Sequence, residues 1–211
     1  MSALLGFDTA TPDTVVALAI DGGEPAELRH TPGPGERPGH AAQLLPLAGA
    51  LLDRAGLGFG DLGRIGVGVG PGTFTGLRIG LASARALGFA LSVPVHGVGT
   101  LDALLCGDGV DVACIDARRG EVFCLGPGIE PQAIDPEALA ALLPAGATVA
   151  GDGAVRYRDA LSAAHVPPDD SPLHLPHARH HAALHATAGP PEPCYLRAPD
   201  AERNLAMRAA G

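Results

Sequence analysis

The chain lacks the features that place a protein in a membrane or direct it out of the cell. It has no uninterrupted run of about 18 apolar residues, which a membrane-spanning helix needs. Its first residues, MSALLGFDTA, contain no basic segment followed by a long apolar stretch, so no export signal is expected. These absences predict a cytoplasmic protein with no membrane partner.

Positive charge is also scarce. Fourteen Lys and Arg residues stand against 23 Asp and Glu residues, which gives a formal net charge of -9. A broad surface for nucleic acid needs clustered Lys and Arg side chains. This chain alone is therefore not expected to hold RNA over a wide area, and any nucleic acid would be held mainly by a partner.

The four cysteines show no CxxC spacing, which argues against a zinc site and against a thioredoxin-type dithiol. Cys114 and Cys124 are placed symmetrically about Arg119, so they would face each other if this stretch forms a hairpin. Because a cytoplasm is reducing, we expect thiols packed in a core and no disulfide.

What remains is the composition of a folded protein, with 46% hydrophobic and 18% charged residues in 211. Apolar periodicity predicts an α/β protein with a mixed sheet covered by helices. The expected strands are Leu4–Asp8, Thr14–Ile20, Glu24–His30, Ile65–Val69 and Val93–His96, and the expected helices are Pro38–Ala55, Phe74–Leu91 and Thr100–Leu105.

The order of expected strands and helices then begins again at residue 111 in a shorter form. Asp8 and Asp116 each close an apolar strand before a polar turn and a second strand. This echo predicts two related lobes, an N-terminal one over residues 1–107 and a smaller, reduced one over residues 108–211. The order of elements is that of the ribonuclease-H-like lobes of actin-like and sugar-kinase ATPases, an analogy of fold and not of function.

A glycine loop lies between the fourth expected strand and the helix at Phe74–Leu91. Its glycines Gly70, Gly72 and Gly76 allow two interpretations. A loop of this kind before a helix exposes N–H groups that hold phosphate, yet this one lacks the lysine of a P-loop. Alternatively, the glycines let the backbone approach a neighbouring strand or a partner closely.

The stretch GPGTFTGLRIG at residues 70–80 resembles the hallmark of the TsaB (YeaZ) family. Four further segments agree with that family in the same order, so that the resemblance spans nearly the whole chain. They are FDTAT at 7–11, GVGTL at 97–101, IDARRGEVF at 115–123 and EPCYLR at 192–197.

The resemblance implies a two-lobed actin-like ATPase (ASKHA) fold without catalytic power of its own. Such proteins form a heterodimer with TsaD, which transfers threonylcarbamoyl to N6 of adenosine 37 in ANN-decoding tRNAs, together with the ATPase TsaE. The resemblance implies that the isolated chain has no cofactor and forms a homodimer when TsaD is absent. It also implies that ATP and Mg²⁺ bind at the interface with TsaE and that tRNA is contacted only through the complex. An autonomous ATPase or small-molecule kinase, or a glycoprotease-like metallopeptidase, are the alternatives.

The two aspartate turns favour the non-catalytic interpretation. An actin-like ATPase uses an Asp-x-Gly turn in each lobe to grip phosphate and to reach a metal through water. Here Asp8 and Thr9 are followed by Ala10, and Arg118 and Arg119 occupy the turn after Asp116. We therefore expect vestigial nucleotide turns whose carboxylates serve turn and hairpin hydrogen bonds.

The histidines of segment 174–185 suggest a metal site that other features disfavour. His177, His181 and His185 recur every four residues, so one helix face can carry all three. A metalloprotease HExxH motif would need Glu at position 182, which is Ala. We expect a solvated, partly charged helix and no metal, and no residue qualifies as a catalytic nucleophile.

The resemblance also implies a partner surface, since family members associate through the two helices expected at Pro38–Ala55 and Phe74–Leu91. Their small and apolar residues allow close helix-to-helix approach. On this basis the substitution Leu81→Asp is expected to leave the fold intact and to abolish TsaD binding. The interface residues expected are His40, Leu44, Phe74, Thr75, Leu77, Arg78, Leu81 and Arg85.

Overall fold

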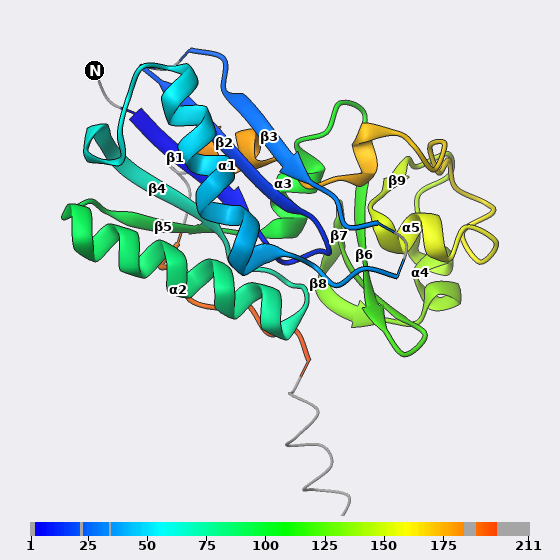
Figure 1. Cartoon of the computed structure of the whole chain (residues 1–211). Helices are drawn as coiled ribbons and strands as arrows, with labels where there is room; N and C mark the ends of the chain where they lie inside the picture. The colour runs from blue at the N-terminus through cyan, green and yellow to red at the C-terminus, as the bar shows by residue number, and fades with distance from the viewer. Residues whose placement is uncertain (1–2, 22, 34, 184–188, 198–211) are drawn as a thin grey trace, which may run out of the picture.

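Two β-sheets lie side by side in the computed structural model, which describes residues 3–21, 23–33, 35–183 and 189–197 (Figure 1). The first sheet has the strand order β3-β2-β1-β4-β5. Its strands are β1 (Ala3–Asp8), β2 (Thr14–Ile20), β3 (Ala26–His30), β4 (Leu62–Gly68) and β5 (Val95–Val98).

The strand directions in this sheet define the fold. β1 pairs antiparallel with β2 and β2 antiparallel with β3, whereas β4 runs parallel to both β1 and β5. A meander of three strands followed by parallel strands joined through helices is the ribonuclease-H-like arrangement. The predicted meander and the predicted mixed sheet are therefore confirmed.

Helices α1 (His40–Arg54) and α2 (Phe74–Leu91) cover one face of the first sheet. Since side chains alternate along a strand, Leu5 and Phe7 of β1 point to this face and are fully buried. Leu44 of α1 and Leu81 of α2 pack into the same apolar core. The apolar stripe of each helix is thus used to build this lobe.

The opposite face carries the short helix α6 (Ala178–Ala183), which contacts β1, β2 and β4. Glycines on the strands permit this approach. A Cβ on Gly6 would lie 2.7 Å from the carbonyl oxygen of Ala178, and one on Gly66 would lie 2.8 Å from that of His181. The helix therefore rests directly on the backbone of the sheet.

The substitution Gly66→Ala is expected to push α6 away from the sheet. A methyl group in this packed space should destabilise the protein by about 1–3 kcal/mol. Gly49→Ala is the matched control, because nothing lies within 4 Å of a Cβ at this position inside α1. It should stabilise by roughly 0.5–1 kcal/mol. Urea denaturation of both variants measures the difference, and equal effects would contradict the close approach of α6.

The second sheet has four strands in the order β8-β7-β6-β9. It has its own core, in which Val112, Val122, Leu139 and Leu161 are buried. Its elements are β6 (Val112–Arg118), β7 (Glu121–Gly126), β8 (Ile129–Ile134), α4 (Pro136–Leu142), β9 (Val149–Ala150) and α5 (Asp152–Arg156). This confirms a second lobe that is a reduced version of the first.

Several segments within the described residues connect the lobes, among them α3 (Thr100–Leu105) and the segment that leads to α6. Helix α3 follows β5, and its Leu101 and Leu104 pack against β6 of the second sheet. After the second lobe and the 3-10 turn η2 (Pro172–His174), α6 returns to the first sheet. The domain boundary expected between residues 107 and 108 therefore marks only the first passage of the chain from the first lobe to the second. The 3-10 turn η1 (Phe59–Asp61) leads into β4.

Cys114 and Cys124 are directly opposite each other in the β6–β7 hairpin, as expected, and both are free thiols. Burial raises the pKa of Cys124 to about 11. Such a thiol is protonated at neutral pH and behaves as a core residue. Among the described helices, none is long and apolar enough to cross a membrane.

Candidate functional site

Asp8, at the end of β1, is buried with 1% of its surface exposed, and three groups surround its carboxylate. The backbone N–H of Ala10 donates to Oδ1 at 2.6 Å. The Thr100 hydroxyl donates to Oδ2 at 2.7 Å, and Nε2 of His181 lies 2.8 Å from the same oxygen. Asp8 therefore joins β1, α3 and α6.

These contacts keep Asp8 ionised. Burial alone would raise its pKa, but the hydrogen bond and charge of His181, with the bonds from Ala10 and Thr100, hold the pKa below the ordinary value of 3.8. A buried charge is tolerated when it is paired and hydrogen-bonded. Both oxygens of the carboxylate are thus engaged by groups of the protein itself.

The glycine loop packs tightly against the residues that follow Asp8. A Cβ on Gly72 would lie 2.4 Å from the carbonyl oxygen of Ala10, and one on Gly76 would clash with the carbonyl oxygen of Thr9. The Thr73 N–H also donates to the Ala10 carbonyl at 2.7 Å, and the Thr9 hydroxyl donates to the Gly76 carbonyl at 2.7 Å. Of the two interpretations of these glycines, the geometry favours close backbone packing.

The second aspartate turn is also occupied by protein groups. The Asp116 carboxylate accepts a hydrogen bond from the Arg118 N–H at 2.9 Å and forms ion pairs with the side chains of Arg118 and Arg156. The Asp116 N–H donates to Asp152, whose pKa burial raises to about 6. Asp116 therefore connects the hairpin to Arg156 and Asp152.

The hairpin between β6 and β7 has an unusual backbone. Arg118 and Arg119 have φ angles of 63° and 59°, and Gly120 follows at 80°. Such angles favour Gly, Asn or Asp at the centre of a two-residue hairpin turn. For other residues they cost on the order of 1 kcal/mol each. Two consecutive arginines with these angles are therefore unusual, one of them at the last paired position of β6 and the other in the turn.

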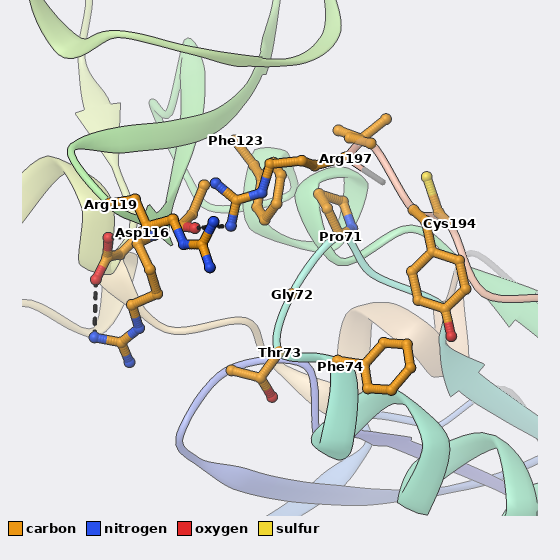
Figure 2. Close-up of a pocket in the computed structure, with 13 residues that line it drawn as sticks. Pro71, Gly72, Thr73, Phe74, Asp116, Arg119, Phe123, Cys194 and Arg197 are labelled. Atoms are coloured by element: carbon orange, nitrogen blue, oxygen red, sulfur yellow. Dashed lines mark hydrogen bonds and ion pairs between the residues drawn. The ribbon is translucent and has the colours of Figure 1, made fainter. Parts of the chain in front are cut away.

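A cavity of about 420 Å³ opens between the lobes, beside this hairpin (Figure 2). Its walls are the glycine loop from Pro71 to Phe74, the turn from Asp116 to Arg119, and the segment from Cys194 to Arg197. Figure 2 shows Arg119 and Arg197 on one side and Phe74 on the other. The cavity thus brings together three segments that are far apart in sequence.

The structure corrects half of the expected partner surface. His40, Leu44, Leu77 and Leu81 are at most 4% exposed, because they belong to the helix faces that pack inside the first lobe. They cannot contact a partner, and Leu81→Asp should unfold the lobe instead of leaving it intact. The other four expected interface residues are exposed on α2 and stay a prediction: Phe74, Thr75, Arg78 and Arg85.

The exposed side of α2 carries more than these four residues. Ala82, Ala86 and Ala90 form a stripe of small side chains on it. Beside them lies Phe89, which is 90% exposed, and on α1 the side chain of Leu45 is 47% exposed. Sequence reasoning missed this narrow stripe because alanine gives a weak periodic signal.

The prediction of a solvated histidine helix is wrong for the described residues. His181 is fully buried against Asp8, and Nδ1 of His177 lies 2.8 Å from a carboxylate oxygen of Glu27 on β3. His180 Nδ1 lies 2.7 Å from the carbonyl oxygen of Ala103. His177 and His181 connect this segment to the first sheet, and His180 connects α6 to α3. His185 lies outside the described residues. In the described ranges, no group of three or more His, Cys, Asp or Glu side chains is arranged to hold a metal.

Comparisons with known proteins match this chain to proteins named for threonylcarbamoyladenosine modification of tRNA and to YeaZ. Residues 36–136 match the family model described as TsaD, tRNA N6-adenosine threonylcarbamoyltransferase. An uncharacterised Mycobacterium tuberculosis protein is 38% identical over 154 residues, covering 64% of this chain and 69% of the relative. TsaB from Escherichia coli, a tRNA threonylcarbamoyladenosine biosynthesis protein, is 36% identical over 126 residues, 57% of this chain and 52% of that protein.

A solved structure from Pseudomonas aeruginosa supports the same conclusion. It is described as an uncharacterised protein with similarity to peptidase YEAZ. It superposes on this chain with a TM-score of 0.76 at 30% sequence identity, covering 93% of this chain and 100% of its own.

Proposed function

Because this chain belongs to the TsaB/YeaZ family and is therefore involved in threonylcarbamoyladenosine modification of tRNA, we propose that it serves as a non-catalytic partner of TsaD. In this role it binds and activates the transferase subunit, which carries out the transfer of threonylcarbamoyl to tRNA. The chain supplies a folded surface and no reacting group.

The enclosure of Asp8 is the observation that carries the proposal. In an actin-like ATPase the corresponding carboxylate must reach a metal through water. Here its two oxygens are engaged by Ala10, Thr100 and His181. Asp116, the counterpart in the second lobe, is paired with arginines. This arrangement supports structural roles for both aspartates and argues against autonomous phosphoryl transfer.

The exposed side of α2 is the surface proposed for TsaD. Small side chains at Ala82 and Ala86 allow a helix of the partner to approach closely, and Phe89 provides a large apolar anchor of the kind found at interface hot spots. Phe74, Arg78 and Arg85 extend this side along the helix. The same surface would pair two copies of the chain when TsaD is absent.

The remaining partners follow from this assignment. The isolated chain is proposed to need no cofactor, and ATP with Mg²⁺ would act where the complex meets TsaE. Since the formal charge is -9, the bulk of the tRNA would be held by the other subunits.

Size-exclusion chromatography with light scattering tests the proposal. The chain mixed with TsaD should elute as a stable heterodimer, and the isolated chain should not hydrolyse Mg-ATP. Absence of a complex together with ATP hydrolysis would replace the proposal with an autonomous ATPase or kinase. Stoichiometric metal and peptide cleavage by the untagged chain would instead support a metallopeptidase.

A further inference from the structure

We propose that residues 189–197 form a strap that joins the exposed side of α2 to the hairpin between β6 and β7 and that opens as one unit. The strap is a conformational link between the lobes, through which a change at α2 reaches the second lobe. It is a property of the isolated chain, and only its use by TsaD bound on α2 rests on the proposed function.

The strap is attached to the edge of the first sheet. β5 is the last strand in that sheet, and its Gly97 exchanges two hydrogen bonds with Gly189, at 3.0 and 3.1 Å. Further along the strap, the Cys194 N–H donates to the carbonyl oxygen of Val69 at 2.8 Å. These bonds cover part of a sheet edge, where backbone donors and acceptors would otherwise be unpaired. The first part of the strap therefore lies along the first lobe, beside α2 (Figure 1).

Two residues of α2 hold the strap from the side proposed for TsaD. The Arg85 guanidinium donates to the carbonyl oxygen of Pro191 at 2.7 Å. The rings of Phe74 and Tyr195 have their centres 5.7 Å apart, within the range of an aromatic contact. Phe74 and Arg85 are both exposed. A partner that covers this side of α2 and binds the Arg85 guanidinium would therefore withdraw one of the contacts that hold the strap.

The last residue of the strap holds the second lobe. The Arg197 guanidinium forms an ion pair with Glu121, the first residue of β7, at 2.5 Å. It also donates to the carbonyl oxygen of Ala117 in β6 at 2.8 Å. Leu196, next to it, packs against the apolar cluster that contains Phe123. Because one side chain contacts both strands of the hairpin, release of Arg197 would remove a contact from each strand.

The composition of the strap makes it stiff. Its sequence is GPPEPCYLR, with Pro190, Pro191 and Pro193 in its first half. A proline ring fixes the φ angle of its residue, and Pro-rich segments behave as semi-rigid spacers. A displacement at the Arg85 contact is therefore carried along the strap instead of being absorbed by rotation of its backbone.

The strap is also weakly packed. None of its nine residues is fully buried. It borders two cavities, the one shown in Figure 2 and a second of about 460 Å³, and Cys194 lines both. Segments with few buried contacts open at a low free energy, well before the whole protein unfolds. The free space beside the strap allows it to move without displacing the core of either lobe.

Amide hydrogen exchange of the isolated full-length chain, measured by NMR, tests the strap. Removal of a contact accelerates exchange at every amide whose opening breaks that contact. Arg197→Gln should therefore accelerate exchange at Gly189 and Gly97, at the opposite end of the strap, about tenfold through loss of a charged hydrogen bond. Arg85→Gln, which mimics a partner that takes the guanidinium away, should accelerate these two amides and also the Arg118 N–H of the hairpin by about the same factor.

Arg54→Gln, at an exposed position of α1, is the matched control and should leave the exchange of all three amides unchanged. Both strap variants replace side chains that are not buried, so the fold should be retained. Unchanged exchange at Gly189 in Arg197→Gln would mean that the segment frays locally and does not open as one unit. An unchanged Arg118 amide in Arg85→Gln would mean that α2 and the hairpin are not linked.

Either of these results would overturn the proposal. Because the experiment contains no TsaD, failure of the heterodimer test would leave its outcome unaffected, and the two proposals can fail separately.

Discussion

Ala86→Glu is expected to abolish the complex with TsaD while leaving the fold unchanged. Ala86 is exposed in the middle of the small-residue stripe on α2, and glutamate is a good helix former. At a close helix contact, however, its carboxylate would be buried without a partner. Such a charge costs about 3 kcal/mol or more, which corresponds to at least about a hundredfold loss of affinity.

Ala141→Glu provides the matched control, because Ala141 is an exposed residue of helix α4 in the other lobe. Biolayer interferometry should show that the Ala141→Glu variant binds TsaD with unchanged affinity, whereas Ala86→Glu no longer binds. The two variants should have equal melting temperatures. If both variants bound TsaD as well as the original chain, the exposed side of α2 would not be the interface.

His181→Ala is expected to produce the largest loss of stability among single changes at the Asp8 site. The substitution leaves a buried, ionised carboxylate without its main partner. Breaking a buried pair in this way costs about 3–5 kcal/mol. In a protein of this size that corresponds to a fall in melting temperature of roughly 10 °C. The control variant His165→Ala, at an exposed position, should change the melting temperature little.

The pH dependence of this loss identifies its cause. The contacts of Asp8 lower its pKa in the folded protein, so they contribute stability above the unfolded value of 3.8, and this contribution is lost as the pH falls through the folded pKa. In His181→Ala the pKa of Asp8 should rise. The difference in unfolding free energy between the two proteins should therefore be largest near neutral pH and shrink toward pH 4. A difference independent of pH would mean that His181 acts through packing alone.

Local patterns in the sequence were sufficient for the elements of the fold. The helix expected at Phe74–Leu91 has these bounds in the structure. Thr73 caps its first turn by accepting from the Gly76 N–H, and Ser92 ends it in the left-handed conformation. The echo of Asp8 in Asp116 likewise predicted the two lobes, because each aspartate ends a buried strand.

Contacts between distant residues were not accessible to the same reasoning. His181 and Asp8 are 173 positions apart, and no periodicity links them. The apolar stripe with Leu44 and Leu81 looks the same in sequence whether it covers a sheet or a neighbouring subunit, so the sequence alone does not decide between the two. The aromatic and arginine walls of the cavity come from three separate segments, so only the fold brings them together.

Reconstitution of the tRNA modification tests whether this chain acts as a non-catalytic partner of TsaD. Purified TsaD and TsaE with ATP, a threonylcarbamoyl donor and an ANN-decoding tRNA are assayed for modified adenosine with and without this chain. Modification is expected to require the chain, to persist when Asp116 is changed to Asn, and to be lost with Ala86→Glu. Full modification without the chain, or its loss with Asp116→Asn in a correctly folded protein, would contradict the role of a non-catalytic partner.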